Sequence, residues 1–138
     1  MFLLDSNVLA EPTKPYPSEV LVRRLREHEG HLCTATTVWH ELVFGVWRMP
    51  PSKRRSALQD YLDGLASTEL KLLPYDQRAA EWHGRERARL QALGTTPPFA
   101  DSQIAAVAAV NDMTLVTNNT KDFMAFSGLR LVDWTMPT

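Results

Sequence analysis

Three carboxylate side chains lie at well-separated places in the sequence: Asp5 follows a predicted strand, Glu41 lies on a predicted helix, and Asp101 opens another predicted helix. The amide of Asn119 follows a fourth such segment. If these groups converge, the carboxylates repel one another and take up protons unless a cation neutralises them. Hard oxygen ligands select Mg²⁺ or Mn²⁺ over zinc. Such an ion polarises a phosphodiester and promotes its hydrolysis, so the pattern favours a metal-dependent nuclease.

The elements that must position these groups are short. Apolar runs predict strands at 2–4, 31–34, 70–73, 114–117 and 129–132. Capping residues, prolines and glycines predict helices at about 18–29, 36–49 (capped by Thr36 or Thr37), 52–66, 76–93 and 101–110. The strand candidates are continuously apolar, as strands covered on both faces are. Strands that alternate with helices indicate an α/β fold with a parallel sheet between two helical layers.

A parallel sheet explains how distant residues could meet. In open parallel sheets, function gathers beyond the carboxyl ends of the strands. Asp5 follows the first predicted strand, together with Ser6 and Asn7, and Asn119 follows the fourth. Asp101 opens the helix that leads into the fourth strand, and Glu41 lies on the helix after the second. We therefore expect them at one edge of the sheet.

Simpler interpretations of each acid stay open at this point. Asp5 and Asp101 each have the position and the side chain of a helix cap. Glu41 lies in a narrow polar wedge of its helix, where a solvated glutamate is equally consistent with the spacing. The broad apolar face of that helix holds Val38, Trp39, Leu42, Val43, Val46 and Trp47. We expect the four tryptophans in the core or at an interface rather than in a base-stacking surface.

Composition indicates one ordinary globular domain over residues 1–138. Fifteen Lys and Arg against sixteen Asp and Glu give a net charge of −1, which excludes a simple polycation. The cations nevertheless cluster, and we expect a phosphate-binding rim from 23–26, 53–55 and the stripe formed by Arg78, Arg85 and Arg89. Cys33 is the single cysteine, and no long apolar run or basic leader is present, so we expect a cytoplasmic protein away from membranes.

Residues 3–12, which read Leu-Leu-Asp-Ser-Asn-Val-Leu-Ala-Glu-Pro, closely resemble the opening of PIN-domain proteins, particularly the VapC and FitB toxins. Further segments resemble the family in the same order: 34–46, 73–80, 100–106, 115–123 and 129–134. The resemblance spans nearly the whole chain. It implies a PIN-like three-layer α/β/α fold with a four- to five-stranded, mainly parallel sheet.

The resemblance also implies an activity: the toxin of a type II toxin–antitoxin pair, acting as a Mg²⁺-dependent endoribonuclease, with Mn²⁺ as the other candidate ion. The family's acidic residues map onto Asp5, Glu41 and Asp101, which would bind the metal. Asn119 occupies the position of a fourth acid and is expected to support catalysis through its carbonyl. Asp122 is a lesser candidate, because a three-residue offset points it elsewhere on most backbones. Ser6 and Thr117 are candidates to hydrogen-bond the carboxylates.

The implied partners are a cognate antitoxin, an RNA substrate, operator DNA reached only through the antitoxin, and a second copy in a homodimer. Two other functions stay open. Because Asn119 removes one negative charge, the fold could act mainly by binding an antitoxin and DNA in a complex, with weak or no catalysis. A phosphatase or phospho-receiver domain ranks low, since Asp5-Ser6-Asn7 lacks the second aspartate of the common phosphatase motif.

Overall fold

The computed structural model describes residues 1–136, so the last two residues of the expected domain 1–138 lie outside the described part. Its strands are β1 (Phe2–Leu4), β2 (Leu32–Ala35), β3 (Lys71–Leu73), β4 (Thr114–Val116) and β5 (Leu131–Val132). Its helices are α1 (Ser6–Leu9), α2 (Glu19–Glu27), α3 (Thr36–Trp47), α4 (Lys53–Ala66), α5 (Gln77–Ala92) and α6 (Phe99–Val110). Two short 3₁₀ turns, η1 (Glu11–Thr13) and η2 (Thr120–Asp122), complete the description.

The five strands form one sheet in the order β3-β2-β1-β4-β5, and all four pairings are parallel. Leu3 of β1 lies between Cys33 of β2 and Leu115 of β4. The chain therefore runs outward from β1 through β2 to β3, then crosses back to β4 on the opposite side of β1. This reversal makes the carboxyl ends of β1 and β4 the expected place for a ligand.

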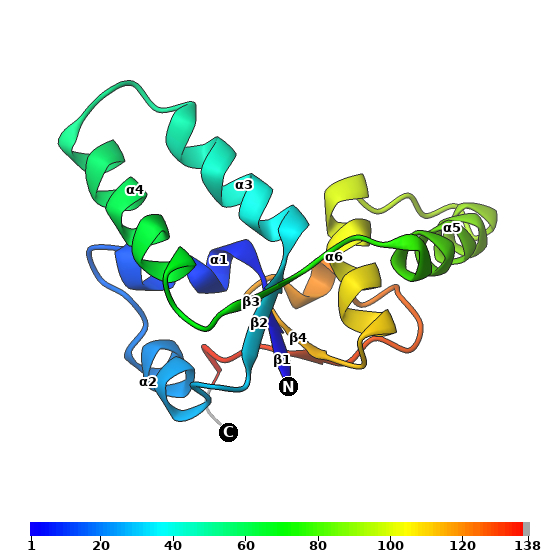
Figure 1. Cartoon of the computed structure of the whole chain (residues 1–138). Coiled ribbons are helices and arrows are strands. Elements are labelled where there is room, and N and C mark those ends of the chain that lie inside the picture. The colour runs from blue at the N-terminus through cyan, green and yellow to red at the C-terminus, as the bar shows by residue number, and fades with distance from the viewer. Residues whose placement is uncertain (137–138) are drawn as a thin grey trace.

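Helices cover both faces of this sheet. Right-handed crossovers place the helices before the reversal on one face and those after it on the other. Figure 1 shows this arrangement, with α2 and α4 on one side of the strands and α5 and α6 on the other. The three-layer α/β/α fold expected from the sequence is confirmed. In the part of the chain that the structure describes, no helix combines the length and the apolar character needed to span a membrane.

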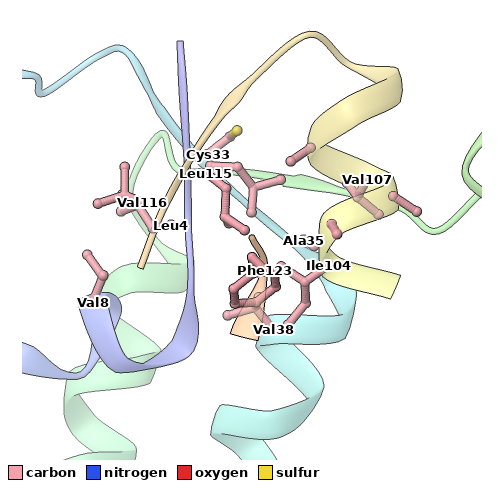
Figure 2. Close-up of a cluster of buried hydrophobic side chains, with 14 of the residues drawn as sticks. Leu4, Val8, Cys33, Ala35, Val38, Ile104, Val107, Leu115, Val116 and Phe123 are labelled. Atoms are coloured by element: carbon pink, nitrogen blue, oxygen red, sulfur yellow. The ribbon is translucent and has the colours of Figure 1, made fainter. Parts of the chain in front are cut away.

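The core lies where the strands meet α6 and α3. Figure 2 shows Ile104 and Val107 of α6 and Val38 of α3 packed beside Leu115 and Phe123. Residues 104–108 of α6 are all fully buried, and three of them are alanines. Small side chains let the helix axis lie close to the sheet, and dense packing fixes its position. The first turn of α6, which carries Asp101, is thereby held rigidly.

Two helix starts differ from the sequence prediction. The prediction that Asp101 opens its helix is wrong, because α6 begins at Phe99, with Pro98 as the preceding residue at φ −54°. Pro98 has a ψ of 140°, so it is the extended residue that ends the loop, and the helix begins directly after it. Asp101 is therefore the third helical residue, and its side chain is free of a capping role.

The prediction that Thr36 or Thr37 caps its helix is also wrong. The residue before α3 is Ala35, and no side chain caps this end. Ala35 is fully buried as the last residue of β2, so the end of the strand determines where α3 begins. The hydroxyl of Thr37 is buried without a hydrogen-bond partner.

Candidate active site

Asp5 lies directly after β1 and is 5% exposed. Its backbone N–H donates to the Val116 carbonyl at 3.0 Å, which ties it to the end of β4. The Ser6 N–H donates to Asp5 Oδ1 at 2.8 Å, and the Thr117 hydroxyl donates to Asp5 Oδ2 at 2.8 Å. Asp5 therefore does cap α1, but both its oxygens are also held at the edge of the sheet where the reversal occurs.

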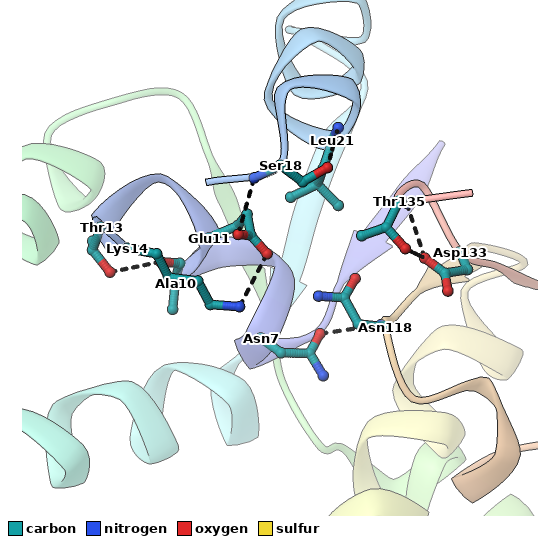
Figure 3. Close-up of polar contacts among 10 residues, drawn as sticks. All are labelled: Asn7, Ala10, Glu11, Thr13, Lys14, Ser18, Leu21, Asn118, Asp133 and Thr135. Atoms are coloured by element: carbon teal, nitrogen blue, oxygen red, sulfur yellow. Dashed lines mark hydrogen bonds and ion pairs between the residues drawn. The ribbon is translucent and has the colours of Figure 1, made fainter. Parts of the chain in front are cut away.

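The segment after β4 provides the hydroxyl that holds the Asp5 carboxylate. Thr117 is fully buried, and its hydroxyl also accepts the Asn119 N–H at 3.1 Å. The Asn118 N–H donates to Asn7 Oδ1 at 3.3 Å, which joins the start of α1 to this loop (Figure 3). Sequence reasoning assigned no contact to Asn7. The only indication in the sequence was its place with Asp5 and Ser6 in the polar segment that follows the first strand.

Glu41 lies half-buried on α3. Burial is the main cause that raises its pKa, and the charge of Asp5 raises the pKa further. A hydrogen bond with Ser6 and the charge of His40 oppose this shift. Helical spacing left the orientation of Glu41 open, whereas the structure turns it toward Ser6 and Asp5.

Asp101 completes the set of three predicted acids. Burial raises the pKa of its carboxyl to about 6, and the charges of Asp5, Asp122 and Glu41 add to the rise, in that order. Burial also raises the pKa of Asp5, partly offset by the Thr117 and Ser6 hydrogen bonds. These interactions mean that β1, α3 and α6 bring their acids close enough to affect one another. We call Asp5, Glu41, Asp101 and Asp122 the acidic cluster.

Asp122 lies nearer to Asp5 and Asp101 than the sequence predicted. Its charge raises the pKa of both Asp5 and Asp101. The reason is local: the Asp122 N–H donates to the Asn119 carbonyl at 3.0 Å, so the 3₁₀ turn η2 folds the chain back toward Asn119. Asn119 itself is exposed.

The donors of the acidic cluster are suited to a hard divalent cation. The carboxylates raise one another's pKa, and a cation among them would relieve that repulsion. The neighbouring groups are hydroxyls and amides, again oxygen ligands of the kind that Mg²⁺ and Mn²⁺ prefer. Within residues 1–136, no three His, Cys, Asp or Glu side chains already converge on one point that could hold an ion. Binding an ion therefore requires Glu41 or Asp101 to rotate, because both oxygens of Asp5 are already held by hydrogen bonds.

A second buried carboxylate has a structural role instead. Glu11 is 4% exposed, and its oxygens accept the Ser18 N–H at 3.3 Å and the Lys14 ammonium at 3.2 Å (Figure 3). These contacts join η1 to the start of α2, whose first turn Ser18 caps. Glu11 is absent from the charges that raise the pKa of the acidic cluster.

The three basic clusters predicted as a phosphate-binding rim differ in how many of their arginines are bound to groups of the protein itself. Arg89 is paired with Glu86 at 2.8 Å, and Arg78 donates to the Val110 carbonyl, so the stripe on α5 is largely engaged within the protein. In the cluster at 23–26, Arg23 pairs with Glu27 and Arg24 donates to a backbone carbonyl. The cluster at 53–55 starts α4, next to the pocket described below.

A pocket of about 290 Å³ opens between α3 and α4 beside the acidic cluster. Glu41 lines it together with Arg48 and Arg54, and its apolar wall includes Leu42 and Leu58. A carboxylate of the cluster and two cations therefore face the same space. This arrangement provides positive charge beside the acids, where a phosphate group approaching them would lie.

Comparison with known proteins agrees with this fold. A family model described as "PIN domain" matches residues 2–128. The chain is 31% identical over 134 residues to "tRNA(fMet)-specific endonuclease VapC" of Shigella flexneri, covering 97% of this chain and 98% of that protein. It is 33% identical over 129 residues to "Toxin FitB" of Neisseria gonorrhoeae, covering 91% of this chain and 92% of that protein.

The fold also matches a solved structure described as FitAB bound to an IR36 DNA fragment. The TM-score is 0.90 at 26% identity, with 100% of this chain and 98% of that chain covered. Nucleases of this family generally depend on a divalent metal, in agreement with the donor set of the acidic cluster. Since the family model matches most of the chain and both relatives exceed 30% identity over more than nine-tenths of it, the chain belongs to the PIN domain family.

Proposed function

We propose that this protein is the toxin of a type II toxin–antitoxin system and hydrolyses RNA phosphodiesters as a Mg²⁺-dependent endoribonuclease, with Mn²⁺ as an alternative ion. The observation that carries the proposal is that four carboxylates from different elements, Asp5, Glu41, Asp101 and Asp122, lie close enough for the charges of the other three to add to the burial that raises the pKa of Asp101 to about 6. A relative named as a tRNA endonuclease over nearly the full chain supports it. We also propose that residues 1–138 form one domain that works in the cytoplasm.

Asp5, Glu41 and Asp101 would hold the metal ion, with Asn119 as a supporting ligand. Asp122 adds negative charge near the same point. When bound, the divalent ion polarises the scissile phosphate and promotes ionisation of the attacking water. The acids cannot do this alone, because an uncompensated acidic cluster repels a phosphodiester.

The other residues keep the acids in place. The Ser6 N–H and the Thr117 hydroxyl each hold one oxygen of Asp5, so its carboxylate plane is fixed. Supporting hydrogen bonds of this kind orient ligands and raise metal affinity. The packing of α6 against the sheet fixes the backbone that carries Asp101. Arg48 and Arg54 would attract the flanking phosphates toward the pocket.

The test is cleavage of RNA by the purified protein, by Asp5→Asn and by Asp101→Asn, in Mg²⁺, in Mn²⁺ and in EDTA. Both substitutions keep the side-chain volume and remove the charge, so we expect activity to fall by on the order of 100-fold. Asp112→Asn is the matched control, because Asp112 is an exposed acid paired with Arg130. Equal cleavage by wild type and Asp5→Asn, or undiminished cleavage in EDTA, would contradict the proposal.

A second candidate function is favoured by Asn119, which leaves the cluster with one negative charge fewer than a fourth acid would. In this alternative the fold acts mainly by binding an antitoxin and DNA in a complex, with weak or no catalysis. The relative in the FitAB structure is bound to a DNA fragment. Titration calorimetry separates the two: binding of Mn²⁺ to the antitoxin-free protein favours the nuclease, and no binding favours the alternative.

We further propose a cognate antitoxin as partner, operator DNA bound only through that antitoxin, and a homodimer of this chain. A basic antitoxin side chain inserted among the carboxylates would neutralise them as a metal ion does. Static light scattering of the co-purified complex tests the assembly. A single heterodimer with one copy of each chain would contradict the homodimer.

A further inference from the structure

The hydroxyl of Thr37, in the first turn of α3, is a buried hydrogen-bond donor without a partner. Within residues 1–136, the other buried side-chain atoms found without a partner are His83 Nε2 and Asn118 Oδ1. The Asn118 atom is a carbonyl oxygen, which accepts hydrogen bonds but donates none. His83 lies on α5, a helix that carries no member of the acidic cluster. The Thr37 hydroxyl therefore differs from both, because it is a donor on the helix that carries Glu41.

The place of Thr37 in the chain explains why its hydroxyl has no local partner. A threonine inside a helix can donate to the backbone carbonyl four residues earlier. Four residues before Thr37 the chain is still in β2, whose backbone groups pair with the neighbouring strands. A buried hydroxyl that is left unpaired lowers the stability of a fold, because water solvates it in the unfolded chain. Such a group calls for a functional explanation.

The nearest acid along the helix is Glu41, four residues after Thr37. Residues four apart in an α-helix lie within about 40° of each other around the axis, with a rise of about 6 Å. Their side chains are therefore neighbours, and each side chain leans toward the N-terminus of its helix. The Glu41 side chain thus leans toward Thr37, which places its carboxylate within reach of the hydroxyl in one of its rotamers.

The beginning of α3 is the well-packed part of this helix. It lies between α1, which follows Asp5, and α6, which carries Asp101, and α3 contacts both helices (Figure 1). Val38 is fully buried, whereas Trp47 at the other end, which the sequence placed in the core or at an interface, is 58% exposed. Hydrogen bonds near Thr37 are therefore formed inside the protein, where water does not replace them.

Glu41 has a hydrogen bond with Ser6 in the structure, which leaves the Thr37 hydroxyl unused. Both oxygens of Asp5 are held by the Ser6 N–H and the Thr117 hydroxyl, so Asp5 does not need to move when an ion binds. A carboxylate that binds a metal ion is itself oriented by hydrogen bonds from neighbouring groups. Once Glu41 turns toward the ion, Thr37 is the free donor one helical turn away.

We propose that Thr37 is a positioning residue for Glu41: when the Glu41 side chain turns to hold the divalent ion, the Thr37 hydroxyl donates to its carboxylate. The hydrogen bond that the hydroxyl lacks in the structure is then formed. This inference rests on the proposed function, and it names Glu41 as the acid that rotates.

The test measures stability and metal affinity separately on the full-length chain. Valine keeps the volume of threonine and removes the hydroxyl, so Thr37→Val removes an unpaired buried donor. We expect the unfolding equilibrium constant in EDTA, from urea titration, to fall about fivefold. Calorimetric titration should show Mn²⁺ affinity weakened about 10-fold. A side chain with only a structural role would not gain stability while losing metal affinity.

Two further variants serve as controls. Thr37→Ser keeps the hydroxyl, so its Mn²⁺ affinity should stay within about twofold of wild type. Thr36→Val makes the same substitution at the preceding, exposed residue and should change neither measurement. A Thr37→Val protein that is less stable than wild type in EDTA, or that binds Mn²⁺ equally well, would overturn the proposal. So would a serine variant that binds Mn²⁺ as weakly as the valine variant.

A double substitution tests whether the hydroxyl acts through Glu41. Glu41→Asp keeps the charge but shortens the side chain by one methylene, which takes the carboxylate out of reach of Thr37. In this background Thr37→Val should change the Mn²⁺ affinity by less than twofold, because the two groups no longer interact. A further 10-fold loss would mean that the hydroxyl acts on another group and would overturn the proposal.

Failure of this inference is distinguishable from failure of the proposed function. Wild type that binds Mn²⁺ and cleaves RNA, with Thr37→Val of unchanged affinity, overturns only the role of Thr37. Wild type that binds Mn²⁺ but does not cleave RNA, with Thr37→Val of weakened affinity, overturns only the ribonuclease assignment. Wild type that binds no Mn²⁺ overturns both.

Discussion

Replacing Thr117 by valine tests whether the buried hydroxyl supports Asp5. Valine has the same shape as threonine, so the substitution removes the hydroxyl without creating a cavity. Thr117 is fully buried, and its hydroxyl donates to Asp5 Oδ2 at 2.8 Å. A hydrogen bond to a charged group contributes about 1.5–3 kcal/mol, so we expect Thr117→Val to lower the free energy of unfolding by that amount.

Thr34→Val is the matched control. Thr34 is also fully buried, on β2 at the other side of β1, and its hydroxyl donates to the uncharged Leu4 carbonyl at 2.6 Å. A bond between neutral groups contributes about 0.5–1.5 kcal/mol. The two variants should therefore differ by about 1–1.5 kcal/mol, roughly a tenfold difference in the unfolding equilibrium constant.

Two assays measure how the two valine substitutions change stability and metal affinity. Urea unfolding at fixed protein concentration gives the free energies, provided that the dependence on urea is the same for all variants. Calorimetric titration with Mn²⁺ should show affinity weakened about 10- to 100-fold in Thr117→Val and unchanged in Thr34→Val.

Combining each variant with Asp5→Asn isolates the pairwise contribution. We expect a coupling energy above about 1 kcal/mol for Thr117 with Asp5 and near zero for Thr34 with Asp5. Equal destabilisation by the two valine variants, together with equal Mn²⁺ affinity, would refute the assignment of Thr117 as the residue that positions Asp5.

The Arg89 hydrogen bonds lower the pKa of Glu86 below its usual 4.5, with burial opposing and the Ser127 N–H helping. The ionised Glu86 side chain therefore stabilises the fold fully above pH 4.5, and this stabilisation is lost as the pH falls through the lower pKa of the folded state. We expect the melting temperature of Glu86→Gln to fall less steeply below pH 4.5 than that of wild type. Gly84→Ala, in the middle of α5 with no atom within 4 Å of an added Cβ, should raise stability by about 0.5–1 kcal/mol, whereas Gly94→Ala, at φ +79°, should lower it by about 1 kcal/mol. Urea titrations that rank these two variants the other way would contradict the backbone argument. Phe123→Ala, at a position 1% exposed, should cost about 3–5 kcal/mol by the same titration, and a loss below 1 kcal/mol would mean that the core in Figure 2 collapses around the vacancy.

Much of the fold was predictable from local sequence. The apolar runs that end at Leu4 and Val116 predicted strands because continuous hydrophobicity over three or four residues is typical of doubly covered strands. Asp5 followed from its position after the first run, since the residue after a parallel strand lies at the edge where ligands bind. Even the fifth, two-residue strand was predicted from its apolar run.

Other features depended on contacts between distant segments. Local spacing could not decide whether Glu41 faces solvent or Asp5, because that depends on where α3 packs against the sheet. The stripe of arginines on α5 resembled a phosphate-binding surface, yet Arg89 is held by Glu86 three residues away and by the Ala125 carbonyl. The sequence alone does not distinguish an arginine that is paired within the protein from one that is free to bind phosphate.

By itself, the sequence determined the order of the strands along the chain and the place of Asp5 directly after the first strand, because these depend on local hydrophobicity and on the chemistry of single side chains. Only the tertiary structure decided that Asp122 approaches the cluster, that the pKa of Asp101 rises to about 6, and that Trp47 is exposed beside Arg55. The physical reason is that burial and Coulomb interaction depend on distance through space. The sheet reversal between β3 and β4 creates those distances.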